Sequence, residues 1–589
     1  MSQEITSYES FQDAYIRPQK AREAVDNQKI DARMDFTVLN EQLTAATPKT
    51  GWREIQGTTV RPDFKSVYYS ALEKSAVDEG LPVDVVTQDI IETKGYDQIY
   101  AAKALTPEGL GKTAAEVRLN HLPKNIAQTK QNLTDLMENL DSTLVDVSEF
   151  IKQEYRARLA KELRYCEEAQ HIGDEGFTAN HLSENGWNNL LDSDSLDGDE
   201  LKLKYEDDAL AVLKINRSRE TRPERYTTIA DALATWHLTE TEHANLQLTS
   251  EEIQGNQFPA ERIQQFFQLL QAREPKLHQW QMIIDDSAVA VTVNGEMRTV
   301  LIPQKRVFTP ADLVAIPAHE FVHIIGSENG YEQPIATMIE GMEDYGPTEE
   351  GKAVFGELIT GQEFGDKRQV KMTARYYAIS MAIKTEQAED GSPVAKYSMQ
   401  DIFNTLVEMK VDLADAKDIV WRIMRGTSLQ RKVVPVSVGG KNISVGEVYS
   451  KDAIYFEGQM LMFNRLLQGL PLSTEERADL ARWETRDVSN RLLARVGRRA
   501  FLGENKDLSK ELPDAAEQRV SRRKEIYNEL LKKGKEVMYQ LLQYALVGTI
   551  NWDVLEKRRD EWNEILNRDP NKLANYALVM RGPTPLVSA

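Results

Sequence analysis

The sequence predicts an α+β fold that is predominantly helical, with a small β-sheet or hairpins in its middle part. Between residues 123 and 170, apolar residues recur every three or four positions, which is the spacing of one helix face. Two other segments alternate apolar and polar residues around glycine turn signals, at 289–301 and 433–445. Helical patterns lie on both sides of these segments. The helical stripe consists of Leu133, Leu136, Leu140, Leu144, Val147 and Ile151.

The length predicts two or three domains. The chain has 589 residues, of which 41% are hydrophobic, enough for sizeable cores. We expect a helical N-terminal region at 1–205, a central domain at 206–470 and a helical C-terminal region at 471–589. The first boundary lies near residues 185–205. Within it, residues 192–200 resemble a calcium-binding loop but place the third acid one position out of register. A solvated linker is the better interpretation of this segment.

The charge and the cysteine content restrict the partners and the compartment. The chain carries 72 Lys and Arg and 93 Asp and Glu, a net charge of −21. This balance argues against binding to nucleic acid or anionic membranes. Cys166 is the single cysteine, so no internal disulfide forms, and no apolar run approaches the about 18 residues that span a bilayer. The N-terminus shows no secretion signal, and we expect a cytoplasmic protein whose helical terminal regions are candidate surfaces for a protein partner.

The most specific motif is H-E-F-V-H at residues 319–323. On a helix, residues four positions apart share a face, so His319 and His323 can bind one metal ion. Glu320 is rotated by about 100° around the helix axis, which places its carboxylate beside a metal-bound water as a candidate general base. This arrangement is typical of zinc peptidases. The alternative is a helix whose two histidines are satisfied by hydrogen bonds and whose glutamate faces solvent.

A third protein ligand decides between these interpretations, because catalytic zinc takes three. The extension of the motif to a third ligand six residues after His323 fails, since that position holds Asn329. The other arrangement uses a glutamate from a following helix, and Glu349 and Glu350 are available there. We expect this helix to follow a break at residues 346–347 with Thr348 as its N-cap. The alternative for both glutamates is that they are ordinary first-turn acids, which stabilise a helix through its dipole.

The segment before the motif also fits a zinc peptidase. A hairpin precedes the motif helix, and such enzymes bind peptide along an edge strand by main-chain pairing. Thr309, followed by Pro310 and Asp312, is typical of a helix start. Pro317 either kinks this helix or begins a new one two residues before His319.

Several short motifs, in this order, resemble the zinc carboxypeptidases that include the tubulin tyrosine carboxypeptidases, with bacterial relatives labelled by a Q-E-G-L-A motif. The resemblance covers roughly residues 215–465. Two departures stand out: the family spaces its histidines one residue further apart, and Lys352 replaces the leucine of its E-E-G-L-A stretch. The matching segments are His319-Glu320, Asn329-Gly330, Gln333-Pro334, Gly341, Tyr345, 348–353, 422–426 and 450–458.

The resemblance implies a gluzincin-like metallopeptidase core that holds one zinc ion. Its ligands would be His319, His323 and Glu350. In gluzincin aminopeptidases, which share the E-E-G-x-A pattern, the ligand glutamate directly precedes the glycine, so Glu350 is the first candidate and Glu349 the second. Glu320 would accept the proton of the attacking water.

The later motifs imply further site residues. Tyr455 is a candidate donor to the oxyanion of the tetrahedral intermediate. Arg425 and Lys451 are candidates for binding the terminal carboxylate of the substrate, and arginine offers two parallel hydrogen bonds. The alternative for each cation is a structural salt bridge, for example between Lys451 and the adjacent Asp452.

These observations predict a zinc-dependent carboxypeptidase that removes C-terminal residues from a peptide or protein. One alternative is a zinc endopeptidase or aminopeptidase of the gluzincin type. Another is a non-catalytic regulatory or binding protein that has kept the zinc fold. The complete set of ligand and base positions speaks against the last, because a protein without activity has no reason to keep the base.

Overall fold

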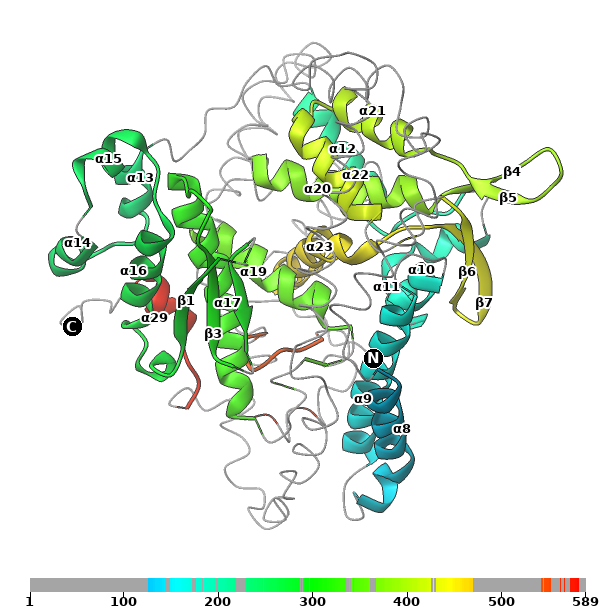
Figure 1. Cartoon of the computed structure of the whole chain (residues 1–589), viewed down its shortest axis with the longest axis horizontal. Helices are drawn as coiled ribbons and strands as arrows, with labels where there is room; N and C mark the ends of the chain where they lie inside the picture. Colours follow the sequence, from blue (N-terminus) through cyan, green and yellow to red (C-terminus); the bar gives the residue numbers. More distant parts are fainter. Residues whose placement is uncertain are drawn as a thin grey trace. The chain divides into compact units, whose positions relative to one another are not determined.

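The computed structural model describes most of the central part of the chain and several C-terminal segments (Figure 1). These are residues 126–469, with gaps, and residues 542–543, 545–551, 562, 566 and 572–581. The gaps are 144–148, 172–175, 183, 198–199, 218–227, 247, 287, 289, 296, 334–337, 339–340, 343, 361–366, 425–426 and 428–430. The described residues fall into two compact units, here called the first unit (from 221–366 and 458–589) and the second unit (from 126–220 and 367–457).

The predicted fold class is confirmed. Helices dominate the described residues, and the strands there form one three-stranded and two two-stranded sheets. The three predicted regions with boundaries at 205 and 470 stay a prediction. Within the described part of the chain, no helix has the length and apolar character needed to cross a membrane.

The first unit contains a small mixed sheet packed against helices. The sheet order is β1-β3-β2, with β1 parallel and β2 antiparallel to β3. The β2–β3 pair is the hairpin predicted at 289–301, whereas β1 was not predicted. Helix α16 packs on β1 and β3, and α17 contacts β2. The elements, in order, are α13 (Ile229–Ala234), α14 (Glu240–Leu246), α15 (Ser250–Gly255), α16 (Ala260–Gln271), η5 (Pro275–Leu277), β1 (Gln281–Asp285), β2 (Thr292–Asn294), β3 (Thr299–Pro303), α17 (Pro310–Tyr331), α19 (Gly346–Thr360) and α29 (Tyr576–Arg581).

Helix α17 carries the H-E-F-V-H motif and is buried on nearly all sides. It begins with the capping box that the sequence predicts: the Thr309 side chain accepts from the Asp312 amide, and the Asp312 side chain accepts from the Thr309 amide. Pro317 lies inside the helix and does not begin a new one. A helix that is apolar around its whole circumference belongs in a core, which gives its few polar residues fixed surroundings.

Helix α19 follows α17 and packs against it. The prediction that Thr348 is its N-cap is wrong, because the helix already begins at Gly346. The amide of Glu349 donates to the carbonyl of Tyr345 (3.0 Å), which is the first helical bond and places the start ahead of Thr348. Pro347 is compatible with this start, since a first-turn proline loses no helical hydrogen bond.

The second unit consists of a long helical pair, a helical cluster and two hairpins. Leu133 and Leu140 of the predicted apolar stripe are fully buried, but the segment forms two helices, α8 and α9. The predicted hairpin at 433–445 is confirmed, and Gly439 and Gly440 both have positive φ at its turn. The elements are α8 (Ile126–Thr143), α9 (Glu149–Gln170), α10 (Gly176–His181), α11 (Glu184–Leu190), η4 (Ser193–Asp197), α12 (Glu206–Arg217), α20 (Lys367–Ile383), β4 (Thr385–Gln387), β5 (Pro393–Ala395), α21 (Met399–Glu408), α22 (Leu413–Met424), β6 (Val433–Val438), β7 (Lys441–Gly446), η6 (Ser450–Asp452) and the start of α23 (Ala453–Gly469).

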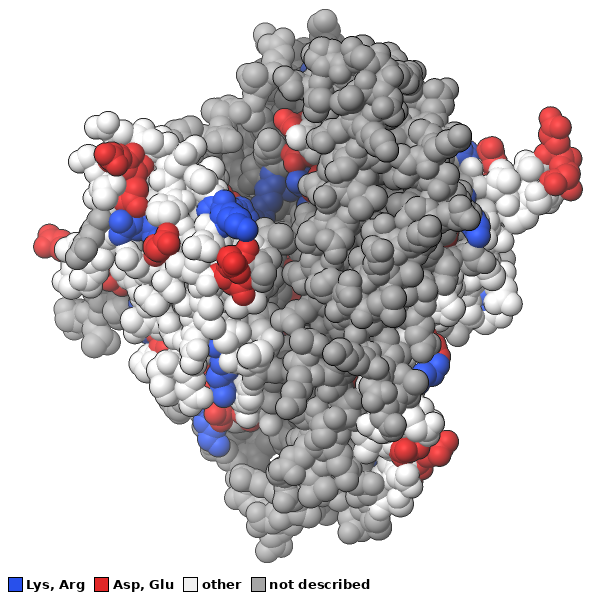
Figure 2. Space-filling model, viewed as in Figure 1, with Lys and Arg blue, Asp and Glu red and all other residues white. Residues whose placement is uncertain are grey.

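Exposed acidic side chains gather on the β4–β5 hairpin of the second unit (Figure 2). Glu386 lies on β4, and Glu389 and Asp390 lie at the turn. Charges at such a hairpin oppose edge-to-edge pairing with another sheet.

Two of the motif glycines meet in the first unit. A Cβ atom added to Gly351 would lie 2.3 Å from the carbonyl oxygen of Gly458. One added to Gly458 would lie 2.6 Å from the amide nitrogen of Gly351. Only glycine permits this approach of α19 and α23, and it joins two motifs that are far apart in the sequence.

We expect Gly351→Ala to lower the free energy of unfolding by about 1–3 kcal/mol, because the added methyl group meets backbone that no rotamer change can move away. Gly255→Ala is the control, since a Cβ there meets nothing within 4 Å. Urea unfolding of both variants measures the difference. Equal stability of the two variants would show that the helices separate without cost.

Candidate metal centre

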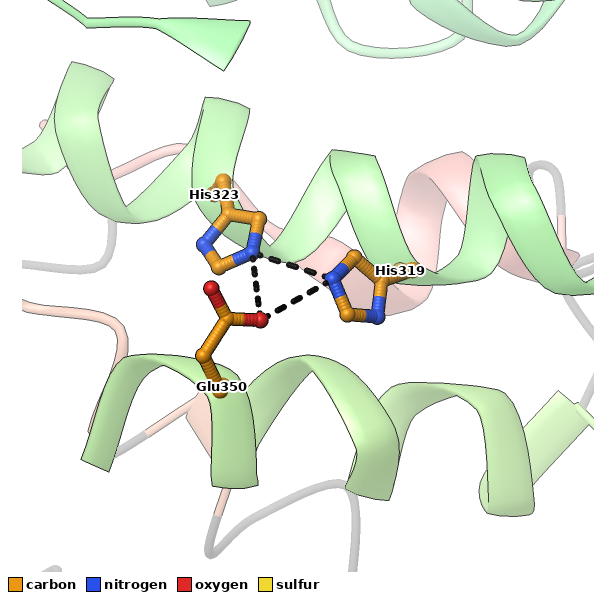
Figure 3. Close-up of side chains that lie close together, drawn as sticks. All are labelled: His319, His323 and Glu350. Atoms are coloured by element: carbon orange, nitrogen blue, oxygen red, sulfur yellow. Dashed lines mark hydrogen bonds and ion pairs between the residues drawn. The ribbon is translucent and has the colours of Figure 1, made fainter. Parts of the chain in front are cut away.

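Three side chains from two helices converge on one point in the first unit (Figure 3). His319 and His323 lie one turn apart on α17, and Glu350 faces them from α19. The two Nε2 atoms are 3.3 Å apart, and Glu350 Oε2 lies 3.3 Å from His319 Nε2 and 3.8 Å from His323 Nε2. All three donor atoms lie within 4.8 Å of one another, so they could hold a metal ion.

The donor atoms of the three side chains fit a bound cation. Glu350 Oε2 is buried and has no hydrogen-bond partner. It points at two imidazole nitrogens, so lone pairs converge on a small buried volume. A bound cation satisfies all three at once, and two imidazoles with one carboxylate are a donor set that suits zinc.

One further carboxylate lies beside Nδ1 of each imidazole. His319 Nδ1 lies 2.7 Å from Oε1 of the fully buried Glu357. His323 Nδ1 lies 3.7 Å from Glu349 Oε2. The hydrogen bond to Glu357 holds the His319 proton on Nδ1 and leaves Nε2 free to bind a metal, whereas Glu349 acts on the His323 ring through its charge. The alternative, in which hydrogen bonds alone satisfy both histidines, accounts for His319 Nδ1 and for the two Nε2 atoms, which lie 3.3 Å apart. It does not account for Glu350 Oε2, which is buried without a hydrogen-bond partner.

The electrostatics of the centre favour positive charge. Burial opposes it, but the ion pairs of the His319 ring with Glu350 and Glu357 raise the pKa of His319 to about 10. For Glu350, burial is likewise outweighed by its ion pairs with His319 and His323, which hold its pKa well below the usual value. The carboxylates thus stabilise a cation in this pocket, whether a proton or a metal ion.

Glu349 and Glu350, which follow the start of α19, have different surroundings. Glu350 Oε2 faces both Nε2 atoms, whereas Glu349 Oε2 faces Nδ1 of His323 on the other side of its ring. Glu349 Oε1 forms an ion pair with Lys352. The geometry therefore favours Glu350 over Glu349 as the third ligand.

Glu320 is half-buried and follows His319 on α17. Its charge contributes to the raised pKa of His319, so its carboxylate lies within electrostatic range of the centre. A carboxylate beside the ligands, and not among them, is the position that a general base requires.

The remaining predicted site residues belong elsewhere in the chain. Arg425 lies outside the described residues. Lys451 lies on η6 and Tyr455 is half-buried on α23, both within the second unit. Asp452 accepts two hydrogen bonds from Arg422. The predicted roles of Arg425, Lys451 and Tyr455 stay predictions.

Sequence reasoning missed Glu357 and interpreted Lys352 only as a departure from the family pattern. Glu357 follows Glu350 by seven residues, which is two helical turns, so the two carboxylates share a face. That spacing is the signal by which Glu357 could have been found. The partners of Lys352 lie almost two hundred residues further along the chain, and no local pattern points to them.

Residues 218–480 match the family model described as "MATCAP: Microtubule-associated tyrosine carboxypeptidase". The match confirms the resemblance to the tubulin tyrosine carboxypeptidases over this part of the chain, which contains the candidate metal centre. By its description, the matched family is a carboxypeptidase family. No curated protein and no solved structure matches the chain significantly.

Proposed function

We propose that this protein is a zinc-dependent metallopeptidase, and specifically a carboxypeptidase that removes C-terminal residues from a protein or peptide in the cytoplasm. The observation that carries the proposal is the convergence of His319, His323 and Glu350 on one buried point. It lies within the segment that matches a carboxypeptidase family. The three converging side chains support the metal chemistry, and the family match supports cleavage at the C-terminus of the substrate.

The proposed reaction uses few groups. His319, His323 and Glu350 would hold the zinc ion, which when bound would supply polarisation of the scissile carbonyl and a lowered pKa of a water molecule. Glu320 accepts the proton of the attacking water and returns it to the leaving amine. Glu349 and Glu357 hold the imidazoles in place, which keeps the donor atoms ready for the ion.

Substrate recognition is proposed for residues of the later motifs. Tyr455 would donate a hydrogen bond to the developing oxyanion. Arg425 and Lys451 would bind the free carboxylate at the end of the substrate, which a carboxypeptidase must recognise.

The position of cleavage is tested with paired peptides that differ only in a free or amidated C-terminus. The zinc-loaded protein is expected to shorten the free peptides stepwise from the C-terminus and to leave the amidated ones intact, because amidation removes the carboxylate that the enzyme binds. Mass spectrometry of the products measures this, and a chelator-treated sample is the control.

Other results would select the alternatives. Equal cleavage of both peptide forms would reject the carboxypeptidase, with internal fragments indicating an endopeptidase and N-terminal trimming an aminopeptidase. Stoichiometric zinc without cleavage across a broad peptide library would favour a binding module.

A further inference from the structure

A fully buried lysine lies next to the candidate metal centre. Lys352 is 0% exposed and lies one turn after Glu349 on α19. Its Nζ forms an ion pair with Glu349 Oε1 and donates to the carbonyls of Ala545 (3.3 Å) and Gly548 (3.2 Å). All three donor positions of the ammonium group are therefore used.

Glu349 links this lysine to a candidate ligand. Its Oε1 also accepts a hydrogen bond from the Ile550 amide (3.1 Å), while its Oε2 faces Nδ1 of His323 at 3.7 Å. A continuous polar path therefore runs from residues 545–550 through Lys352 and Glu349 to His323.

Further hydrogen bonds join residues 545–551 to α17 and to two residues that lie between α17 and α19 in the sequence. The Thr549 amide donates to the Met338 carbonyl (2.7 Å), and the Met342 amide donates to the Thr549 carbonyl (3.1 Å). The Asn329 side chain, near the end of α17, donates to the carbonyls of Leu546 and Ala574. Residues 545–551 are thus hydrogen-bonded to Asn329 of α17 and to Met338 and Met342, which lie between α17 and α19 in the sequence.

We propose that Lys352 is a positioning residue of the metal centre, which fixes Glu349 so that the His323 ring presents Nε2 to the ion. The proposal also makes residues 545–550 a structural part of the centre, although they lie beyond the residues 218–480 that match the family model. It rests on the proposed function for the presence of the ion.

The charges explain why a lysine belongs here. Glu320, Glu349, Glu350 and Glu357 are four carboxylates around two imidazoles. A buried carboxylate needs a compensating charge, and Lys352 supplies it for Glu349. A leucine, which the family pattern has at this position, would leave Glu349 and two backbone carbonyls without this donor.

The test compares Lys352→Met with Lys384→Met. Lys384 is a second buried lysine (6% exposed) that pairs with Glu206 at 2.6 Å in the second unit. Both changes remove a buried ion pair. Only the partner of Lys352, which is Glu349, also contacts a histidine of the metal centre. Zinc affinity is measured by competition with a chromophoric chelator, alongside thermal unfolding of the metal-free proteins.

Lys352→Met is expected to weaken zinc binding by about 10–100-fold, which is the usual effect of losing an outer partner of a ligand. Lys384→Met is expected to lose stability yet bind zinc like the unchanged protein. In cobalt-substituted samples, the d–d absorption bands should shift only in Lys352→Met, because only there does the His323 ring lose its support. If Lys352→Met does not fold, Lys352→Gln keeps amide donors for the two carbonyls and removes only the charge, with the same expectation.

Wild-type zinc affinity in the Lys352 variants, or an equal loss in Lys384→Met, would overturn the positioning role and leave the proposed function intact. Absence of zinc binding by the unchanged protein would overturn both. Glu349→Gln combined with Lys352→Met should weaken zinc binding no more than either change alone, because both act through His323. Fully additive losses would also contradict the proposal.

Discussion

Glu320→Gln protein is expected to bind zinc as tightly as the unchanged protein and to hydrolyse peptide about 10²–10⁴-fold more slowly. Glutamine has nearly the same size as glutamate, and position 320 is not among the three converging donors. The metal site should therefore persist. Only the proton acceptor is lost, so the effect should fall on kcat more than on zinc content. Metal analysis and steady-state kinetics on the same preparation measure the two quantities.

Glu328→Gln is the matched control for this experiment. Glu328 lies on the same helix but binds Trp280 and Arg298 outside the centre. Its variant should keep its hydrolytic rate even if it is less stable. Hydrolysis by Glu320→Gln at the rate of this control would contradict the proposed mechanism, whereas a loss of zinc from Glu320→Gln would show that Glu320 supports the ion itself.

Local patterns in the sequence account for much of the structure. Period-three-to-four apolar spacing predicts the α8–α9 region, the glycine turn predicts the β6–β7 hairpin, and the H-E-x-x-H spacing places two imidazoles on one face of α17. These features depend on residues within one element or one turn. Short-range geometry determines them, so the sequence shows them directly.

The features that were missed depend on contacts between distant segments. Strand β1 pairs in parallel with β3, and its short run resembles many others until its partner is known. Helix α19 begins at Gly346, where the carbonyl of Tyr345 accepts the first helical hydrogen bond, and not after Thr348, the cap residue that the local sequence predicts. Lys352 has a role only because residues 545–550 lie against α19.

The histidine pair and the glutamate of the candidate centre also differ in how far the sequence predicts them. His319 and His323 come from one helix, so their spacing alone predicts the pair. Glu350 comes from a second helix, whose distance from α17 is set by tertiary packing. The sequence left Glu349 and Glu350 both open, because neighbours on a helix point about 100° apart and only the packing decides which one faces the histidines.

Glu350→Gln is accordingly expected to lose zinc, with an affinity drop greater than the about 10–100-fold expected for a change in an outer partner such as Glu349→Gln. Glutamine at 350 keeps the shape but removes the anionic donor that faces both Nε2 atoms. Glutamine at 349 removes an anionic group that faces Nδ1 of His323 and neither of the Nε2 atoms. Chelator competition on both variants measures the two affinities.

The control for this comparison is Glu274→Gln, which changes another buried carboxylate of the same unit. Glu274 accepts hydrogen bonds from the amides of Lys276 and Asn575, so its variant tests the effect of losing a buried charge alone. It should bind zinc normally. If Glu349→Gln lost zinc and Glu350→Gln retained it, the ligand assignment would be reversed, and the ion would have to lie on the Nδ1 side of His323. Nδ1 of His323 already faces Glu349, so the two variants test which nitrogen of this ring binds the ion as well as which carboxylate is the ligand.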